Sequence, residues 1–236
     1  MLWLTYIFLI IAGYAIKKSN IYDIIVVFLF SLLALLNHDA ADYELIYLPV
    51  YLNPDANIYS SIEVGWIILC QIGNNLRLSY NGFSFIIVFI TMSIVLYFAH
   101  RLTNNTSRFL SLFLVYPGLI SLIQIRQFVA SAIVLLAVLI ITKDDVNLVD
   151  YFKFIIILLF GFLIHKTSVF MLIFILAKLI ISQDTEDKKI IFIIAIIIYS
   201  ALLINAQRIG TYIFGDFKTK AYLQQIGEIE GNIDDP

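Results

Sequence analysis

One arginine, Arg126, lies in a short polar stretch, residues 124–130, between two apolar runs. A charge at the centre of a spanning helix costs roughly 2.5–3.5 kcal/mol on insertion scales, so this arginine needs compensation. The ordinary compensation is a lipid headgroup phosphate or an internal carboxylate at a helix end. The alternative is a site for an anionic ligand, because the guanidinium is permanently charged and its fork matches phosphate geometry. The other ionisable residues favour the ligand site.

The composition is that of a polytopic membrane protein. Hydrophobic residues make up 61% of the chain and charged residues 14%, and the apolar residues fall in long blocks. The formal net charge of -2 gives no reason to expect a nucleic-acid partner. The single Cys70 excludes an internal disulfide and a thiolate metal cluster. The first apolar run lacks a basic n-region and a small-residue cleavage pattern, so it is expected to be a retained span.

The apolar runs predict an all-α integral membrane protein with about eight transmembrane helices and both termini outside. Residues 62–79 are ambiguous. If they cross, Lys and Arg divide about five inside to six outside; if they are re-entrant or in-plane, the division is about eight to three, as the positive-inside rule expects. We therefore expect a single domain, 1–236, with an outer loop at 37–81 that holds this segment and a polar tail at 206–236. The predicted spans are residues 1–16, 21–36, 83–99, 109–123, 128–141, 154–164, 169–181 and 190–205.

Two local patterns add to this topology. At steps of four, Asp39, Tyr43 and Tyr47 share one face of a helix, where a carboxylate would lie beside two aromatic rings. The alternative is an acidic outer loop whose tyrosines anchor it at the membrane interface. Pro117 and Gly118, in the middle of one run, predict a kink that frees backbone groups for neighbours or a ligand to satisfy.

The topology predicts that five ionisable residues from four segments meet at the outer face. They are Asp39, Asp42, Glu63, Arg126 and His165. They would line one cavity that water can reach. The alternative is that each merely ends its own helix, since polar residues collect at helix ends.

In order and spacing, these motifs resemble the EpsG family of bacterial membrane proteins, which is associated with exopolysaccharide and O-antigen chain polymerisation and is similar to C-type glycosyltransferases. The resemblance covers roughly residues 25–180. Family members usually run longer, so the chain is expected to be a short member or a fragment. The residues that carry the resemblance are Asp39, Tyr43, Tyr47, Glu63, Gly65, Trp66, Arg126, Gln127, Ala130, His165 and Ser168.

The resemblance implies a polymerase that joins oligosaccharide repeats carried on undecaprenyl pyrophosphate. Glycosyl transfer needs a base for the acceptor hydroxyl and charge stabilisation for the departing pyrophosphate. Arg126 is the expected pyrophosphate clamp and Gln127 a neutral donor, although neighbours on a helix point about 100° apart. Glu63 would orient sugar hydroxyls or Arg126 itself, or simply place a charge at a helix N-terminus. The implied substrate-binding surface also includes Tyr43, Tyr47 and Trp66.

Asp39 is the preferred general base, and Asp42 and His165 are the next candidates. An unperturbed histidine has a pKa of about 6.5, which suits proton transfer; the alternative for His165 is a histidine that caps a helix end. No metal site and no cofactor are expected; a divalent cation at Asp39, Asp42 and Glu44, which offer the hard oxygens that Mg²⁺ or Mn²⁺ accept, is kept as an alternative.

The expected location is the bacterial cytoplasmic (inner) membrane, with the reaction at its outer face. Expected partners are the polyprenyl-pyrophosphate-linked oligosaccharide, the lipid bilayer, a chain-length regulator and a flippase. Two alternative functions are kept. One is a transporter or flippase-like component with Arg126 and the proline break on an anion pathway, although no internal repeat is found. The other is a membrane transferase of single sugars or acyl groups.

Overall fold

The computed structural model describes residues 2–16, 18–36, 43–54, 62–143 and 145–168. The chain divides into two compact units, Met1–Ile175 and Leu176–Pro236, and every described residue belongs to the first. The described residues form helices joined by turns, with no strand among them. The predicted all-α class is confirmed for this part of the chain. The predicted spans at 169–181 and 190–205 and the tail at 206–236 lie outside the described residues.

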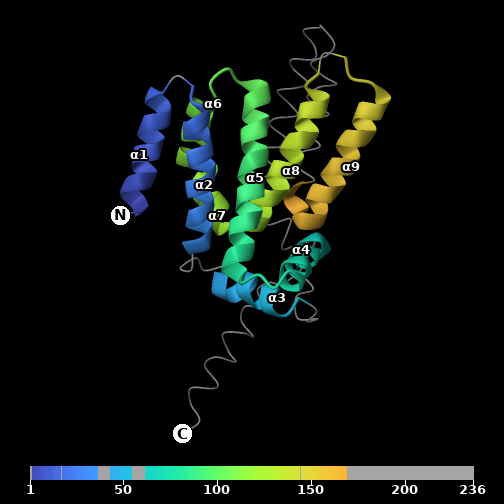
Figure 1. The fold of residues 1–236 in the computed structure, drawn as a ribbon. Coiled ribbons are helices and arrows are strands. Elements are labelled where there is room, and N and C mark those ends of the chain that lie inside the picture. Colours follow the sequence, from blue (N-terminus) through green and yellow to red (C-terminus); the bar gives the residue numbers. More distant parts are fainter. Residues whose placement is uncertain (1, 17, 37–42, 55–61, 144, 169–236) are drawn as a thin grey trace, which may run out of the picture. The chain divides into compact units, whose positions relative to one another are not determined.

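Six helical segments of the described residues lie side by side (Figure 1). Contacts join α2 to α5, α5 to α8, α8 to α9, and α1 to α6. The first two helices meet where Tyr22 Oη of α2 donates to the Leu9 carbonyl, 2.7 Å away, but α1 packs mainly along α6. The segments are α1 (Leu2–Ala15), α2 (Asn20–Leu36), α5 (Tyr80–Leu102), the broken run α6–η3–α7 (Thr106–Phe113, Leu114–Gly118, Leu119–Ile123), α8 (Ile125–Ile141) and α9 (Leu148–Ile164).

The outward faces of these helices are apolar, as in a membrane protein. By length and composition, Tyr80–Leu102 and Thr106–Ile123 are both able to cross a membrane, and three shorter helices are strongly apolar. Large hydrophobic side chains such as Leu4, Phe8 and Phe160 are exposed, while hydroxyls such as Ser31 are buried and donate to carbonyls of their own helix. An apolar exterior over a partly polar interior fits lipid as the surrounding solvent.

The kink predicted at Pro117 is confirmed. The backbone leaves helical geometry at Tyr116 (φ -160°, ψ 130°) and Pro117 (φ -96°, ψ 18°). Proline cannot donate in the helical ladder, and within the break the Leu114 carbonyl accepts a hydrogen bond from Tyr6 Oη of α1 at 2.5 Å. At Gly118 a Cβ would lie 2.8 Å from the same hydroxyl. A neighbouring helix therefore satisfies a backbone group at the break.

A buried carboxylate ties the α1–α2 turn to the start of α6. Asp23 is 1% exposed and accepts from Thr106 Oγ1 at 2.5 Å and from Ser107 Oγ at 2.8 Å. Ser107 Oγ in turn accepts from the Ser19 backbone N–H at 3.0 Å. Asp23 was not predicted as a structural residue, because a single acidic residue near a helix start is usually explained by its favourable interaction with the helix dipole.

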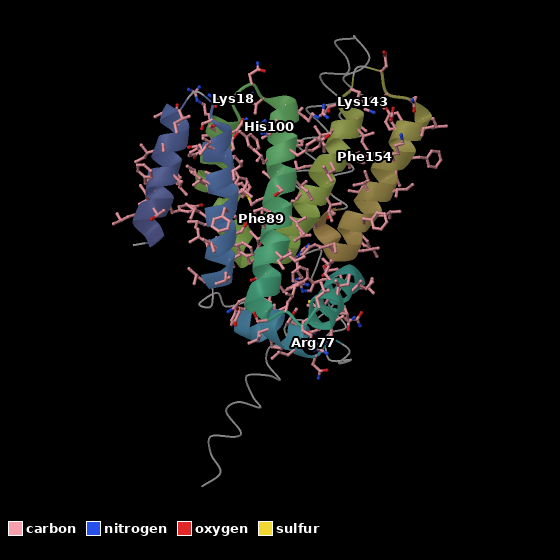
Figure 2. The ribbon with its side chains drawn as sticks, viewed as in Figure 1. Lys18, Arg77, Phe89, His100, Lys143 and Phe154 are labelled. Carbon is pink, nitrogen blue, oxygen red and sulfur yellow. The ribbon has the colours of Figure 1, made fainter. Side chains whose placement is uncertain are left out.

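Basic residues gather at the end of the helices that holds this cluster. Figure 2 shows Lys18, His100 and Lys143 at this end and Arg77 at the other. Arg101 and Arg108 adjoin the α5–α6 turn. This asymmetry follows the pattern that the positive-inside rule describes.

The opposite end carries three short elements: the π-helical turn η1 (Tyr43–Tyr47), α3 (Leu48–Leu52) and α4 (Val64–Asn75) (Figure 1). Twelve residues rise only about 18 Å, against a hydrocarbon core of about 30 Å, so α4 is too short to span by itself. It ends in a Schellman-type turn in which Arg77 has φ 57° and the Leu78 N–H donates to the Gly73 carbonyl. It contacts α3, α5 and α9.

Candidate functional site

Arg126 lies in the first turn of α8. The preceding helix α7 ends at Ile123, Gln124 interrupts the helix with φ -106° and ψ 60°, and α8 begins at Ile125. Arg126 is only 8% exposed. A cation in the first turn of a helix faces the positive end of the helix dipole, and this one is also largely withdrawn from water. Both effects require an anion close to the guanidinium.

Glu63 supplies that anion. Its Oε2 lies 2.8 Å from Arg126 Nη1, and the two side chains are 13% and 10% exposed. Its Oε1 accepts from the Lys166 backbone N–H at 3.2 Å. Glu63 is the N-cap residue of α4 but makes no side-chain capping bond. The sequence allowed two ordinary forms of compensation, and one of them, an internal carboxylate, is therefore present. Glu63 pairs with Arg126, which is one of the roles considered for it.

The ring of Tyr47 lies against the guanidinium and belongs to a cluster of aromatic rings. Arg126 Cζ lies 5.8 Å from the centroid of the Tyr47 ring, a cation–π arrangement. The Tyr47 centroid is 5.9 Å from that of Trp66, which is 5.8 Å from that of Phe83 on α5. Tyr47 and Trp66 are 3% and 1% exposed. Tyr47 is thus a packed core residue, and the alternative of an interface anchor is wrong for it.

A second group of rings packs α3 onto α4 and α5. Tyr51 Oη donates to the Leu78 carbonyl at 2.8 Å, and burial raises the pKa of Tyr51, so its phenol stays a donor. Tyr51 and Tyr43 both contact Tyr80, with centroids 5.6 and 5.2 Å apart. Tyr43 and Tyr47, which were expected on one face beside Asp39, pack against the rings of Tyr80 and Trp66 respectively. These rings fix the short elements against the end of the helices.

Gly65 lets the start of α4 approach the end of α9. A Cβ at Gly65 would lie 2.6 Å from the Leu163 carbonyl oxygen, closer than any side chain allows. Glu63 precedes this contact by two residues, and Lys166 follows Leu163 by three. The close approach is what brings the Glu63 carboxylate to the turn after α9.

His165 is the C-cap residue of α9, and its ring is hydrogen-bonded within the turn that follows the helix. Its backbone N–H donates to the Gly161 carbonyl at 2.9 Å. Its Nδ1 lies 3.3 Å from the Thr167 N–H and 2.8 Å from Thr167 Oγ1. Because a backbone N–H can only donate, Nδ1 is an acceptor here and Nε2 carries the proton of a neutral ring. A role as proton acceptor would require these contacts to break.

Three buried polar side-chain atoms of the described residues have no hydrogen-bond partner: Arg126 Nε, Trp66 Nε1 and Ser168 Oγ. The first two are donors only, and both belong to side chains that contact Tyr47. Ser168 Oγ instead packs towards Gly161 of α9, 3.2 Å from where a Cβ would stand. Buried polar groups without partners are uncommon in native structures and need an explanation.

The structure therefore brings together part of the predicted site. Four segments of the chain meet through Tyr47, Glu63, Trp66, Arg126 and the turn 165–167. Gln127 is exposed while Arg126 is buried, as expected for neighbours on a helix. Lys166 contributes a backbone donor that the sequence analysis missed, although its place beside His165 was a signal.

Asp39, Asp42 and the side chain of Glu44 lie outside the described residues. Within residues 43–54, 62–143 and the other described ranges, no group of three His, Cys, Asp or Glu residues could hold a metal ion.

The family model described as EpsG family matches residues 20–233, which confirms the resemblance to that family. No curated protein matches the chain, and no solved structure matches it.

Proposed function

Because the chain belongs to the EpsG family, we propose that it is a glycosyltransferase of the polymerase type, which joins oligosaccharide repeats carried on polyprenyl pyrophosphate. The observation that carries this proposal is the buried guanidinium of Arg126, whose Nε has no hydrogen-bond partner among the described residues and which pairs with Glu63 at the start of α4, away from the basic turns. A lipid pyrophosphate supplies the acceptor oxygens that such a donor requires.

The proposed topology is multi-pass, in the bacterial cytoplasmic membrane, with eight spans and both termini outside. Among the described Lys and Arg residues, Lys18, Arg101, Arg108, Lys143 and Lys153 adjoin the turns at one end, and Arg77, Arg126 and Lys166 lie at the other. The positive-inside rule assigns the first end to the cytoplasm. Arg126 and the short helix α4 then belong to the outer face, with α4 in-plane or re-entrant.

In the proposed reaction, the acceptor sugar hydroxyl attacks the anomeric carbon of the donor repeat, and the bond to the carrier pyrophosphate breaks. Arg126 stabilises the charge that develops on the departing pyrophosphate. Asp39 takes the proton of the acceptor hydroxyl, with Asp42 as the next candidate. His165 ranks after them because its Nδ1 already accepts from Thr167. The proposed reaction uses no cofactor; a divalent cation at the Asp39–Asp42 segment is the alternative.

The proposal is tested by the lipid-linked intermediate that accumulates when the chain is deleted. A single intact repeat on its carrier is expected, together with loss of polymer. Purified protein in vesicles should elongate lipid-linked repeats without moving them across the bilayer. Translocation without elongation would instead establish the transporter that the Pro117 break favours, and addition of one sugar or acyl group would establish a single-step transferase.

A matched pair of substitutions tests the role of Arg126. Arg126→Lys keeps the charge but removes the planar fork, so a large loss of polymer at a normal protein level is expected. Arg101→Lys is the control, since Arg101 is exposed at the opposite end of the same set of helices. An equal loss from both substitutions would contradict the proposal.

A further inference from the structure

Among the described residues, Arg126 makes one side-chain hydrogen bond, which comes from Nη1 of its guanidinium. Nη1 donates to Glu63, and this is the hydrogen bond that joins the two side chains. Nε is buried and finds no acceptor among the described residues. Nε and Nη2 form one edge of the planar fork, and that edge can bind two oxygens of one phosphate. The ion pair thus leaves the edge suited to phosphate unused.

Trp66 presents a second donor in the same neighbourhood. Its indole Nε1 is buried, in a residue 1% exposed, and lacks a partner within the described part of the chain. The ring of Trp66 and the guanidinium of Arg126 both contact Tyr47. Trp66 also donates its backbone N–H to the Glu63 carbonyl at 3.0 Å, so it is in the same turn as the carboxylate that holds Arg126. An indole N–H is a donor only, so the missing partner is an acceptor.

We propose that the Nε edge of Arg126 and the indole N–H of Trp66 together bind the diphosphate of a polyprenyl pyrophosphate, and that Glu63 is the positioning residue that orients this edge. The inference rests on the proposed function, because it names the part of the carrier that the site recognises. Glu63 is itself fixed from two sides, by Arg126 Nη1 and by the Lys166 backbone N–H. It therefore sets the direction of the guanidinium and does not compete for the Nε edge.

The experiment measures binding of farnesyl pyrophosphate, with farnesol as the phosphate-free probe, to the purified full-length chain in phosphatidylcholine nanodiscs. Arg126→Lys is expected to weaken binding of farnesyl pyrophosphate at least about tenfold, as loss of a charge-assisted bond implies. Trp66→Phe, which keeps an aromatic ring and removes the N–H, should weaken it about two- to tenfold, the range for one neutral hydrogen bond. Glu63→Ala should act like Arg126→Lys, and none of the three should change binding of farnesol.

Two controls separate this role from packing. Phe83→Leu disturbs the same cluster, since the Phe83 and Trp66 centroids are 5.8 Å apart, but it removes no polar atom and should leave farnesyl pyrophosphate binding unchanged. Glu63→Asp keeps the charge and should restore part of the binding that Glu63→Ala loses. A merely structural Glu63 would weaken both probes together, which would overturn the positioning role.

Other outcomes also decide the matter. Normal binding by Trp66→Phe would remove the indole from the site. Full competition by phosphatidylglycerol in the nanodisc would identify a bilayer headgroup, and not the carrier, as the ligand. If the wild-type chain elongates repeats while all three variants bind normally, the inference fails and the proposed function stands. If binding shows the expected dependence but no elongation occurs, the proposed function fails and the diphosphate site stands.

Discussion

Removing the Glu63 carboxylate should destabilise the folded chain through the charge it leaves behind. In Glu63→Ala, Arg126 would keep its charge at 8% exposure with no described anion beside it, and the Lys166 N–H would lose its acceptor. Breaking a buried ion pair from one side costs about 3–5 kcal/mol. Both side chains keep some contact with solvent, so we expect about 3 kcal/mol. At roughly 2–4 °C per kcal/mol, the midpoint of thermal unfolding should fall by about 6–12 °C.

The assay is thermal unfolding of the full-length chain in one detergent, with a double-mutant cycle over Glu63→Ala and Arg126→Ala. The double variant leaves no unpaired charge, so it should be more stable than the sum of the single effects predicts, by about 2 kcal/mol. The control is Lys143→Ala, which breaks an ion pair to Asp150 of 3.3 Å whose lysine side chain is 54% exposed. The Asp150 side chain is 7% exposed, but it keeps its capping-box hydrogen bond, so a loss of about 0–1 kcal/mol is expected. Additive effects, or a loss no larger than that of the control, would refute the reasoning.

Three further outcomes test the surroundings of the site, the first and third by the same unfolding assay and the second by polymer formation. Asp23→Ala should lower stability by about 1–3 kcal/mol because two buried hydroxyls lose their acceptor, whereas Asp145→Ala, at an exposed residue, should change it little. Gly65→Ala should displace α4 and abolish polymer formation, because its Cβ would meet a carbonyl oxygen of α9 at 2.6 Å; Gly82→Ala, whose Cβ would have its nearest neighbour at 3.4 Å, should be tolerated. Asn147→Ala removes the capping box of α9 and should cost about 1 kcal/mol, and no change in midpoint would show that the cap is dispensable.

Apolar runs were enough to locate the long helices. Each predicted run within the described residues overlaps one helix, except 109–123, which overlaps the broken run α6–η3–α7. A lipid-facing helix must be apolar over most of its length. The kink at Pro117 followed from proline chemistry alone. The helix starts differed from the predicted ones: α8 starts at Ile125 and α9 at Leu148, several residues before the apolar runs. The reason is that polar residues can occupy the first turn of a helix when that turn lies near a membrane surface.

The partners within the site could not be predicted. Topology placed Glu63 and Arg126 at the same end, but the pairing depends on Gly65 and the close approach it allows, which no periodicity reveals. The engagement of His165 with Thr167 is likewise a property of one turn. Asp23 was not predicted at all, although it makes one of the most buried polar contacts in the described residues.

The docking of α4 and the neutralisation of Arg126 are the same structural event. The side chains three and four residues from Arg126 along the chain are apolar, namely Leu122, Ile123, Val129 and Ala130, so its own helix offers no anion at the spacing where neighbours meet. The carboxylate must come from another segment, and Glu63 arrives only when the start of α4 lies against the end of α9. A displaced α4 would therefore leave Arg126 unpaired in an apolar setting, a state that costs several kcal/mol. This coupling favours the docked position of α4. It predicts that Gly65→Ala and Glu63→Ala weaken farnesyl pyrophosphate binding to a similar extent, because both remove the same support from the guanidinium.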